Sequence, residues 1–274
     1  MVRRGCKEDS AVFVNHLSST MNLLKLTTLG LTASIIAGTA SAAQPDEAKP
    51  SVVIVHGAFA DGSDFAKVIP LLQAKGLHVV AVQNPLSSLA DDAAAAKRVI
   101  DAQPGKVVLV GHSWGGMVIS QAGDNPKVSA LVYVAAFAPD VGQSVGDLGK
   151  GFAPGAGLSH LAPDAAGWLY LTQEGMSKHF AQDLPAATTS VMTATQGPIN
   201  GSAFADKATV AAWKQKPSWY LLTEADHMIV PDQQRAMSKA INAKVTTVAS
   251  SHVPQQSHPA KVAAVILDAV QSVK

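Results

Sequence analysis

The chain has 274 residues, of which 47% are apolar and 15% are charged, and its formal net charge is +1. This length is sufficient for one or two domains with a full core. The balance of 21 Lys and Arg against 20 Asp and Glu argues against the basic surface that nucleic-acid binding needs. The single Cys, Cys6, excludes an intrachain disulfide and a cysteine-rich zinc site.

The segment 21–42 has the three-part layout of a secretory signal peptide. Lys25 precedes an apolar run, and small residues follow it up to Ala40-Ser41-Ala42, an A-x-A cleavage pattern. The apolar run, at about 13 residues, is shorter than the roughly 20 that cross a bilayer. We therefore expect cleavage after Ala42 and a secreted or periplasmic protein without a stable membrane anchor. An uncleaved anchor or an amphipathic helix is the alternative.

The first 20 residues do not resemble the start of a signal peptide. They show no clear periodicity and carry Glu8 and Asp9, whereas a signal peptide begins near its positive end. We expect Met21 to be the natural translation start, so that 1–42 comprises an extension and a cleaved signal. The range 43–274 is then a single mature domain, and it contains no Cys.

Short apolar runs predict the strands of the mature domain. Each has 4–6 residues and is apolar on both faces, which is typical of buried parallel strands. In chain order the predicted strands are Val52–Val55, His78–Val82, Val107–Val110, Ala130–Ala135, Ser218–Thr223 and Val245–Val248.

Amphipathic stretches between these runs predict helices. Asp91 or Asp92 can cap the second helix, and Pro231 is favourable in the first turn of the fourth. The predicted helices are Asp64–Ala74, Ala93–Ala102, Trp114–Ala122, Pro231–Ile241 and Pro259–Val273. Strands that alternate with helices indicate an α/β fold with a mainly parallel, doubly wound sheet of about six strands, with ligands at the carboxyl ends of the strands.

The alternation breaks at about 140–213, a segment too long for a simple loop. We interpret it as a small helical cap over the strand ends. Its larger apolar side chains, together with Phe59, either line an apolar substrate pocket or form the core of the cap. These cap residues are Trp168, Tyr170, Met176, Phe180 and Met192.

A nucleophile elbow follows the third predicted strand. The sequence Gly111-His112-Ser113-Trp114-Gly115 is a G-x-S-x-G motif between a strand and a helix, which is the context that gives the motif its meaning. Small residues permit the tight turn that projects Ser113 above the sheet. We predict that Ser113 is a nucleophile. A glycine-rich turn with a capping serine is the structural alternative.

A serine nucleophile needs a base and an orienting acid downstream, in the order Ser, acid, His. His252 lies on the loop after the last strand, where it is placed to act as the base. Asp226 follows the strand at 218–223 and is the favoured acid. Asp140 and Glu224 remain alternatives.

Acyl transfer also needs amide donors for the oxyanion. The expected donors are the backbone N–H of Trp114 and that of Ala58, which follows His56-Gly57 at the end of the first strand, with Phe59 as the fallback.

No spacing typical of metal ligands occurs, so we expect no metal and no cofactor.

Taken in order, these motifs resemble the α/β-hydrolase superfamily. More narrowly, they are similar to the small esterases that include plant methylesterases, hydroxynitrile lyases and bacterial relatives. The resemblance extends from Val52 to the C-terminus. It rests on VHGAFADGSDF (55–65), LVGHSWGGMVI (109–119), LVYVAAFAPDVGQS (131–144), WKQKPSWYLLTEADHMIVPDQQRAM (213–237) and SSHVPQQSHP (250–259).

The resemblance implies a Ser113, Asp226 and His252 triad, oxyanion donors at Ala58 and Trp114, and a cap between the sixth and seventh strands of the superfamily core. It also implies that the superfamily's first two strands are missing. Two residues depart from the pattern. Val253 stands where hydroxynitrile lyases of this group have Lys, which argues against cyanohydrin cleavage, and Phe65 stands where many relatives have Trp.

The sequence therefore predicts a serine hydrolase of small carboxylic esters that acts through an acyl-enzyme. Its expected partner is a small-molecule substrate, and nothing in the sequence indicates its oligomeric state. A cofactor-free lyase or perhydrolase on the same fold is the first alternative. A non-catalytic ligand-binding protein is the second, although it would not need all members of a triad.

Overall fold

The computed structural model describes residues 49–273. The predicted signal peptide and translation start lie outside this range. Within it, no helix is both long enough and apolar enough to cross a membrane.

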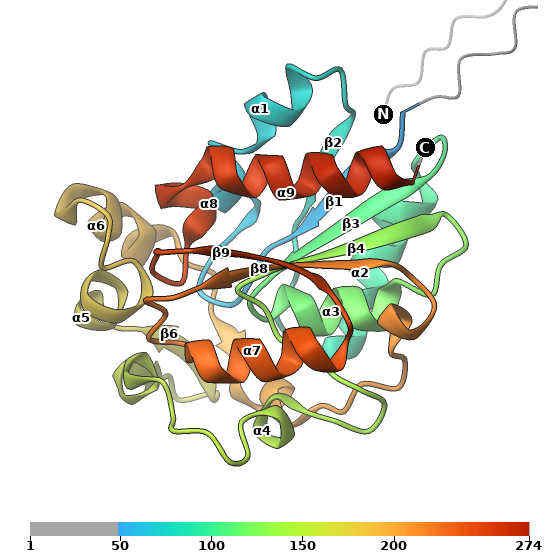
Figure 1. Ribbon diagram of the computed structural model, residues 1–274. Coiled ribbons are helices and arrows are strands. Elements are labelled where there is room, and N and C mark those ends of the chain that lie inside the picture. The colour runs from blue at the N-terminus through green and yellow to red at the C-terminus, as the bar shows by residue number, and fades with distance from the viewer. Residues whose placement is uncertain (1–48, 274) are drawn as a thin grey trace, which may run out of the picture. The chain divides into compact units, whose positions relative to one another are not determined.

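A six-stranded parallel sheet forms the centre of the described domain (Figure 1). Its strand order is β2-β1-β3-β4-β8-β9, and every neighbouring pair is parallel. The strands are β1 (Ser51–Val55), β2 (Val79–Val82), β3 (Val107–His112), β4 (Val128–Val134), β8 (Ser218–Thr223) and β9 (Lys244–Val248). The chain goes from β1 outward to β2 and then returns to β3 on the other side of β1, so the strand order reverses there. The loops that follow these two parallel strands therefore lie together at one edge of the sheet, as in other doubly wound folds.

Helices cover both faces of the sheet. In Figure 1, α1 (Ile69–Gln73) and α9 (Pro259–Ser272) lie on one side, and α2 (Leu89–Asp101), α3 (Gly115–Ala122) and α7 (Pro231–Ala240) lie on the other. The short helices η1 (Gly62–Phe65) and α8 (Pro254–Ser257) follow β1 and β9.

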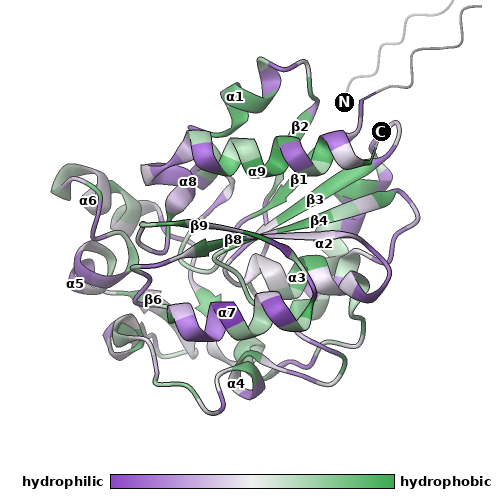
Figure 2. Cartoon of the chain, in the orientation of Figure 1, coloured by the Kyte–Doolittle hydropathy of each residue, from purple (hydrophilic) through white to green (hydrophobic). Residues whose placement is uncertain are grey.

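The alternation of side chains along each strand divides the interior into two cores. In β1, Val52 and Ile54 pack with α1 and α9, whereas Val53 and Val55 face α2, α3 and the cap. All four side chains are buried, so β1 is apolar on both faces. Figure 2 shows β3 and β4 in the colour of apolar residues and α7 with many hydrophilic residues.

The cap lies between β4 and β8, where the alternation breaks. It contains helices, as predicted, and also a small antiparallel sheet in the order β5-β6-β7. Its elements are α4 (Val145–Leu148), η2 (Ala156–His160), β5 (Leu161–Pro163), β6 (Trp168–Leu171), α5 (Gln173–Gly175), the π-helix η3 (Met176–Phe180), α6 (Ala186–Thr195), β7 (Ile199–Asn200), η4 (Gly201–Ala205) and η5 (Ala212–Lys214).

Three local predictions need correction. The helix expected over 64–74 is divided into η1 and α1. The second helix begins at Leu89 because Ser88 caps it, with its hydroxyl accepting the Asp91 N–H at 3.1 Å, so neither Asp91 nor Asp92 is the cap. The last strand is an edge strand, and Val245 is exposed rather than buried.

Candidate active site

The loops that follow β1, β3 and β9 meet at one cavity. Ala58, Ser113 and His252, one from each loop, line the same cavity of about 710 Å³. The parallel sheet causes this convergence, because the carboxyl ends of its strands share one edge.

Ser113 lies in a sharp turn between β3 and α3, with a left-handed φ of 53° that a non-glycine residue rarely adopts. The surrounding chain stabilises this conformation. The Ser113 N–H donates to the Val134 carbonyl at 3.2 Å, and the Ser113 carbonyl accepts the Gly116 N–H at 3.0 Å. A Cβ on Gly57 would lie only 2.7 Å from the Ser113 Cβ, so a larger residue there would displace the loop after β1.

Two backbone amides beside Ser113 are available to a ligand. Within the described part of the chain, neither the Ala58 N–H nor the Trp114 N–H has a hydrogen-bond acceptor. The Phe59 N–H, by contrast, donates to the Gly197 carbonyl at 3.2 Å, so this fallback donor is already engaged. Ala58 and Trp114 both line the cavity.

His252 and Asp226 form a buried pair. The distance between His252 Nδ1 and Asp226 Oδ2 is 2.7 Å, and both side chains are almost fully excluded from solvent. Because a carboxylate only accepts, Nδ1 carries the proton. In the neutral imidazole, Nε2 is then the unprotonated nitrogen, which is the form that a general base requires.

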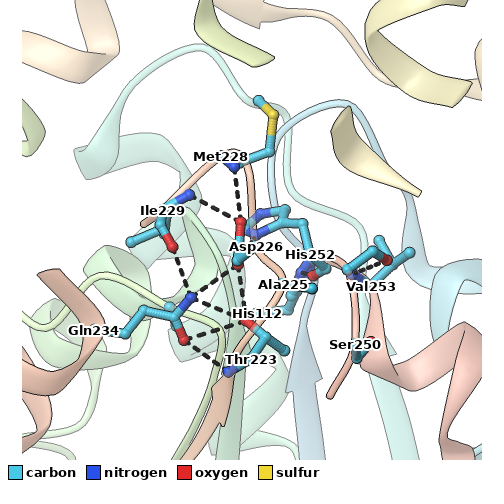
Figure 3. Close-up of polar contacts among 12 residues, drawn as sticks. His112, Thr223, Ala225, Asp226, Met228, Ile229, Gln234, Ser250, His252 and Val253 are labelled. Atoms are coloured by element: carbon cyan, nitrogen blue, oxygen red, sulfur yellow. Dashed lines mark hydrogen bonds and ion pairs between the residues drawn. The ribbon is translucent and has the colours of Figure 1, made fainter. Parts of the chain in front are cut away.

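Four further groups donate to the Asp226 carboxylate (Figure 3). The backbone N–H groups of Met228 and Ile229 donate to Oδ1 at 2.8 and 3.0 Å. The Thr223 hydroxyl and the Gln234 amide donate to Oδ2 at 2.8 and 2.9 Å. A buried carboxyl group with this many donors is held in one orientation.

The two other candidate acids lie elsewhere. Asp140 pairs with Lys214 at the surface, where hydrogen bonding to that Lys lowers its pKa. Glu224 is exposed next to the end of β8. Neither contacts His252, so the structure brings only Asp226 to the histidine.

His112, the residue before Ser113, contacts the histidine loop. Its Nε2 lies 2.8 Å from the His252 carbonyl and must donate, since a carbonyl only accepts. Its Nδ1 is 3.8 Å from Oδ2 of Asp64, a buried carboxyl that accepts from the Gln255 amide. Burial lowers the pKa of His112 well below its usual value and raises that of Asp64 to about 6.

Asp92, which the sequence indicated only as a possible helix cap, is a second buried carboxyl. It accepts from Trp114 Nε1 at 2.7 Å and from the Leu86 N–H at 2.8 Å, and burial raises its pKa to about 6. Asp92 therefore anchors the side chain of Trp114, one of the residues that line the cavity. No local pattern distinguishes Asp64 and Asp92 from surface carboxylates, because their burial depends on distant segments.

The cavity wall is mainly apolar. Of the six residues considered for the pocket, Phe59 and Phe180 line it, whereas Met192 lines a smaller neighbouring pocket that shares Phe59. The other three do not line the cavity: Met176 is buried in the core, and Trp168 and Tyr170 belong to β6 of the cap. Six further apolar residues that were not predicted from the sequence also line the cavity: Phe137, Phe152, Leu158, Leu161, Phe204 and Met228.

Among residues 49–273, no group of three or more His, Cys, Asp or Glu side chains is arranged to hold a metal ion. The site described above consists of a serine, a buried His–Asp pair and two available amides, set beside an apolar cavity.

Sequence comparison finds hydrolases over most of the chain. A probable hydrolase of Phoma sp. is 27% identical over 243 residues, which is 80% of this chain and 98% of that protein. Methylesterase 2 of Arabidopsis thaliana is 26% identical over 78% of this chain and 93% of its own length. The pyrethroid hydrolase of Sphingobium wenxiniae is 25% identical over 79% and 86%.

Solved structures have the same fold. A pyrethroid hydrolase from Sphingobium faniae has a TM-score of 0.69 at 21% identity, covering 81% of this chain and 98% of its own. Polyneuridine aldehyde esterase has a TM-score of 0.71 at 20% identity, covering 81% and 99%. Residues 52–265 match the alpha/beta hydrolase family. The chain belongs to the alpha/beta hydrolase family.

Proposed function

We propose that the protein hydrolyses carboxylic esters through a Ser113–His252–Asp226 triad and a covalent acyl-enzyme. The observation that carries this proposal is the convergence on one cavity of Ser113, in its strained turn, and His252, bonded at 2.7 Å to a buried Asp226. The names of the methylesterase and pyrethroid hydrolase relatives support ester hydrolysis.

Each residue has a defined role in the reaction. His252 Nε2 accepts the Ser113 proton as Oγ attacks the ester carbonyl, and Asp226 stabilises the imidazolium. The negative charge that develops on the carbonyl oxygen is held by the Ala58 and Trp114 amides. His252 then protonates the leaving alcohol. In the second half, water attacks the acyl-enzyme with His252 as base, which releases the acid and restores Ser113.

The cavity favours esters with a bulky apolar group over the small esters expected from the sequence. Its volume of about 710 Å³ lies in the upper part of the range for sites that enclose drug-sized ligands. Aromatic side chains from the cap and the core, including Phe152, Phe180 and Phe204, line it, and Lys150 is the only Lys or Arg in the wall.

Replacement of the nucleophile tests the proposal. We expect Ser113→Ala to lower the rate of p-nitrophenyl ester hydrolysis by more than about 1000-fold, because the residual rate comes from binding and the amides alone. It should also abolish labelling by a fluorophosphonate probe. Ser159→Ala, an exposed serine outside the cavity, is the matched control. Labelling of Ser113→Ala at the wild-type level would contradict the assignment.

A further inference from the structure

Three histidines lie together outside the catalytic cavity. His160 ends η2 and His179 lies in η3, both in the cap, while His227 follows Asp226 in the loop after β8. None of them lines the cavity that contains Ser113. The proposed hydrolysis uses none of the three.

The imidazole rings of His179 and His227 approach each other through their Nδ1 atoms. Their Nδ1 atoms are 3.3 Å apart, with ring centroids separated by 5.5 Å. His160 stacks on His179, with centroids 4.7 Å apart and an interplanar angle of 29°. The stack restricts the orientation of the His179 ring.

This spacing fits a shared metal ion. Two imidazole nitrogens bound to a tetrahedral ion at about 2.0–2.1 Å are themselves about 3.3–3.4 Å apart. His227 is exposed and His179 is half-buried, so water can reach the pair and complete the coordination. When no ion is bound, the same distance allows one Nδ1–H to donate to the other Nδ1.

We propose that Nδ1 of His179 and Nδ1 of His227 bind one divalent transition-metal ion of the zinc, copper and nickel class. Imidazole suits these ions, whereas magnesium and calcium prefer oxygen ligands. The site has two protein ligands with water in the remaining positions, which is consistent with the lack of a three-residue group among residues 49–273. The expectation of no metal rested on local ligand spacing, and these two histidines are 48 positions apart.

The bound ion would join the cap to the loop that carries Asp226. That junction already contains two hydrogen bonds: the Gly157 N–H donates to the His227 carbonyl at 2.9 Å, and the Gln182 amide donates to the Ala225 carbonyl at 2.6 Å. A metal bridge at the same place holds the cap on the core. Because the ion binds the folded state, saturation with it should raise the melting temperature.

The experiment uses the full chain without a polyhistidine tag. Zn²⁺ is titrated by calorimetry, and the melting temperature is measured with and without Zn²⁺. The variants are His179→Ala and His227→Ala, with His78→Ala, an exposed histidine in another part of the chain, as the matched control. The Gly157 contact uses the backbone of His227, so His227→Ala retains it, and the melting temperature without Zn²⁺ verifies folding.

We expect one Zn²⁺ per chain and a higher melting temperature in the wild type and in His78→Ala. Both effects should be lost in His179→Ala and in His227→Ala. A wild-type protein that binds no Zn²⁺ would overturn the proposal. Retention of the full binding in folded His179→Ala and His227→Ala would also overturn it, because it would place the ion elsewhere.

Discussion

Thr223 is the last residue of β8, and its buried side chain contacts Asp226. Its hydroxyl donates to Asp226 Oδ2 at 2.8 Å and accepts from the Gln234 amide at 2.9 Å. A single side chain therefore orients both the carboxylate and one of its other donors. Hydrogen bonds to buried charged groups contribute more to stability than those between neutral groups.

Thr223→Val removes this hydroxyl and preserves the shape of the side chain. We expect a loss of about 1–3 kcal/mol in the free energy of unfolding. We also expect kcat to fall by up to about tenfold, because Asp226 orients His252 less firmly. Urea unfolding and ester hydrolysis measure the two effects. Thr223→Ser keeps the hydroxyl and should recover most of kcat; an equal loss in both variants would show that the hydroxyl is not what orients Asp226.

At the level of elements, α2 connects the elbow to the cap. Its Asp92 holds Trp114, and the backbone N–H of its first residue, Leu89, donates to Asp206 of the cap at 2.8 Å. The helix begins there because Ser88 caps it, with an extended backbone and a hydroxyl that accepts the Asp91 N–H. The neighbouring Ser87 only donates to the Asp91 carboxylate.

Ser88→Ala and Ser87→Ala form a matched pair for this helix start. Loss of the cap should reduce the free energy of unfolding by about 1 kcal/mol in Ser88→Ala. Ser87→Ala should change it by less than about 0.5 kcal/mol, as is usual for surface sites. Chemical unfolding of both variants measures the difference, and equal values would show that Ser88 does not cap the helix.

For the molecule as a whole, the buried Asp and His side chains make the free energy of unfolding depend on pH in opposite directions. Burial raises the pKa of Asp64 and of Asp92 to about 6. Their contribution to stability is therefore greatest at low pH and is lost as the pH rises through about 6. Burial lowers the pKa of His56 and of His112, and their contribution is lost as the pH falls below the ordinary histidine value.

Asp64→Asn separates these opposing contributions. Between pH 7 and pH 5 the wild-type Asp64 contributes about 1 kcal/mol of added stability, because the folded state takes up a proton that the unfolded state does not. The variant lacks this gain, so acidification should reduce its stability more than that of the wild type. Urea unfolding at both pH values tests the difference. Parallel changes in the two proteins would mean that Asp64 is ionised throughout.

Local patterns predicted the strands and the elbow that carries Ser113. Apolar runs such as 218–223 predict buried strands because both faces of a parallel sheet are covered, and β8 spans that range. The G-x-S-x-G string between a strand and a helix predicted the elbow, since its glycines are required by the turn itself. The prediction that Ser113, Asp226 and His252 belong to one site followed from the resemblance and from the positions of the strand ends.

Only the tertiary structure decided which groups meet. It brought Asp226 rather than Asp140 to His252, placed Met176 in the core rather than in the cavity wall, and buried Asp64 and Asp92. It also set His179 against His227. Secondary structure and tight turns depend on neighbouring residues, so the sequence could specify them. Contacts between loops depend on the packing of segments that are far apart in the chain, and no local pattern encodes them.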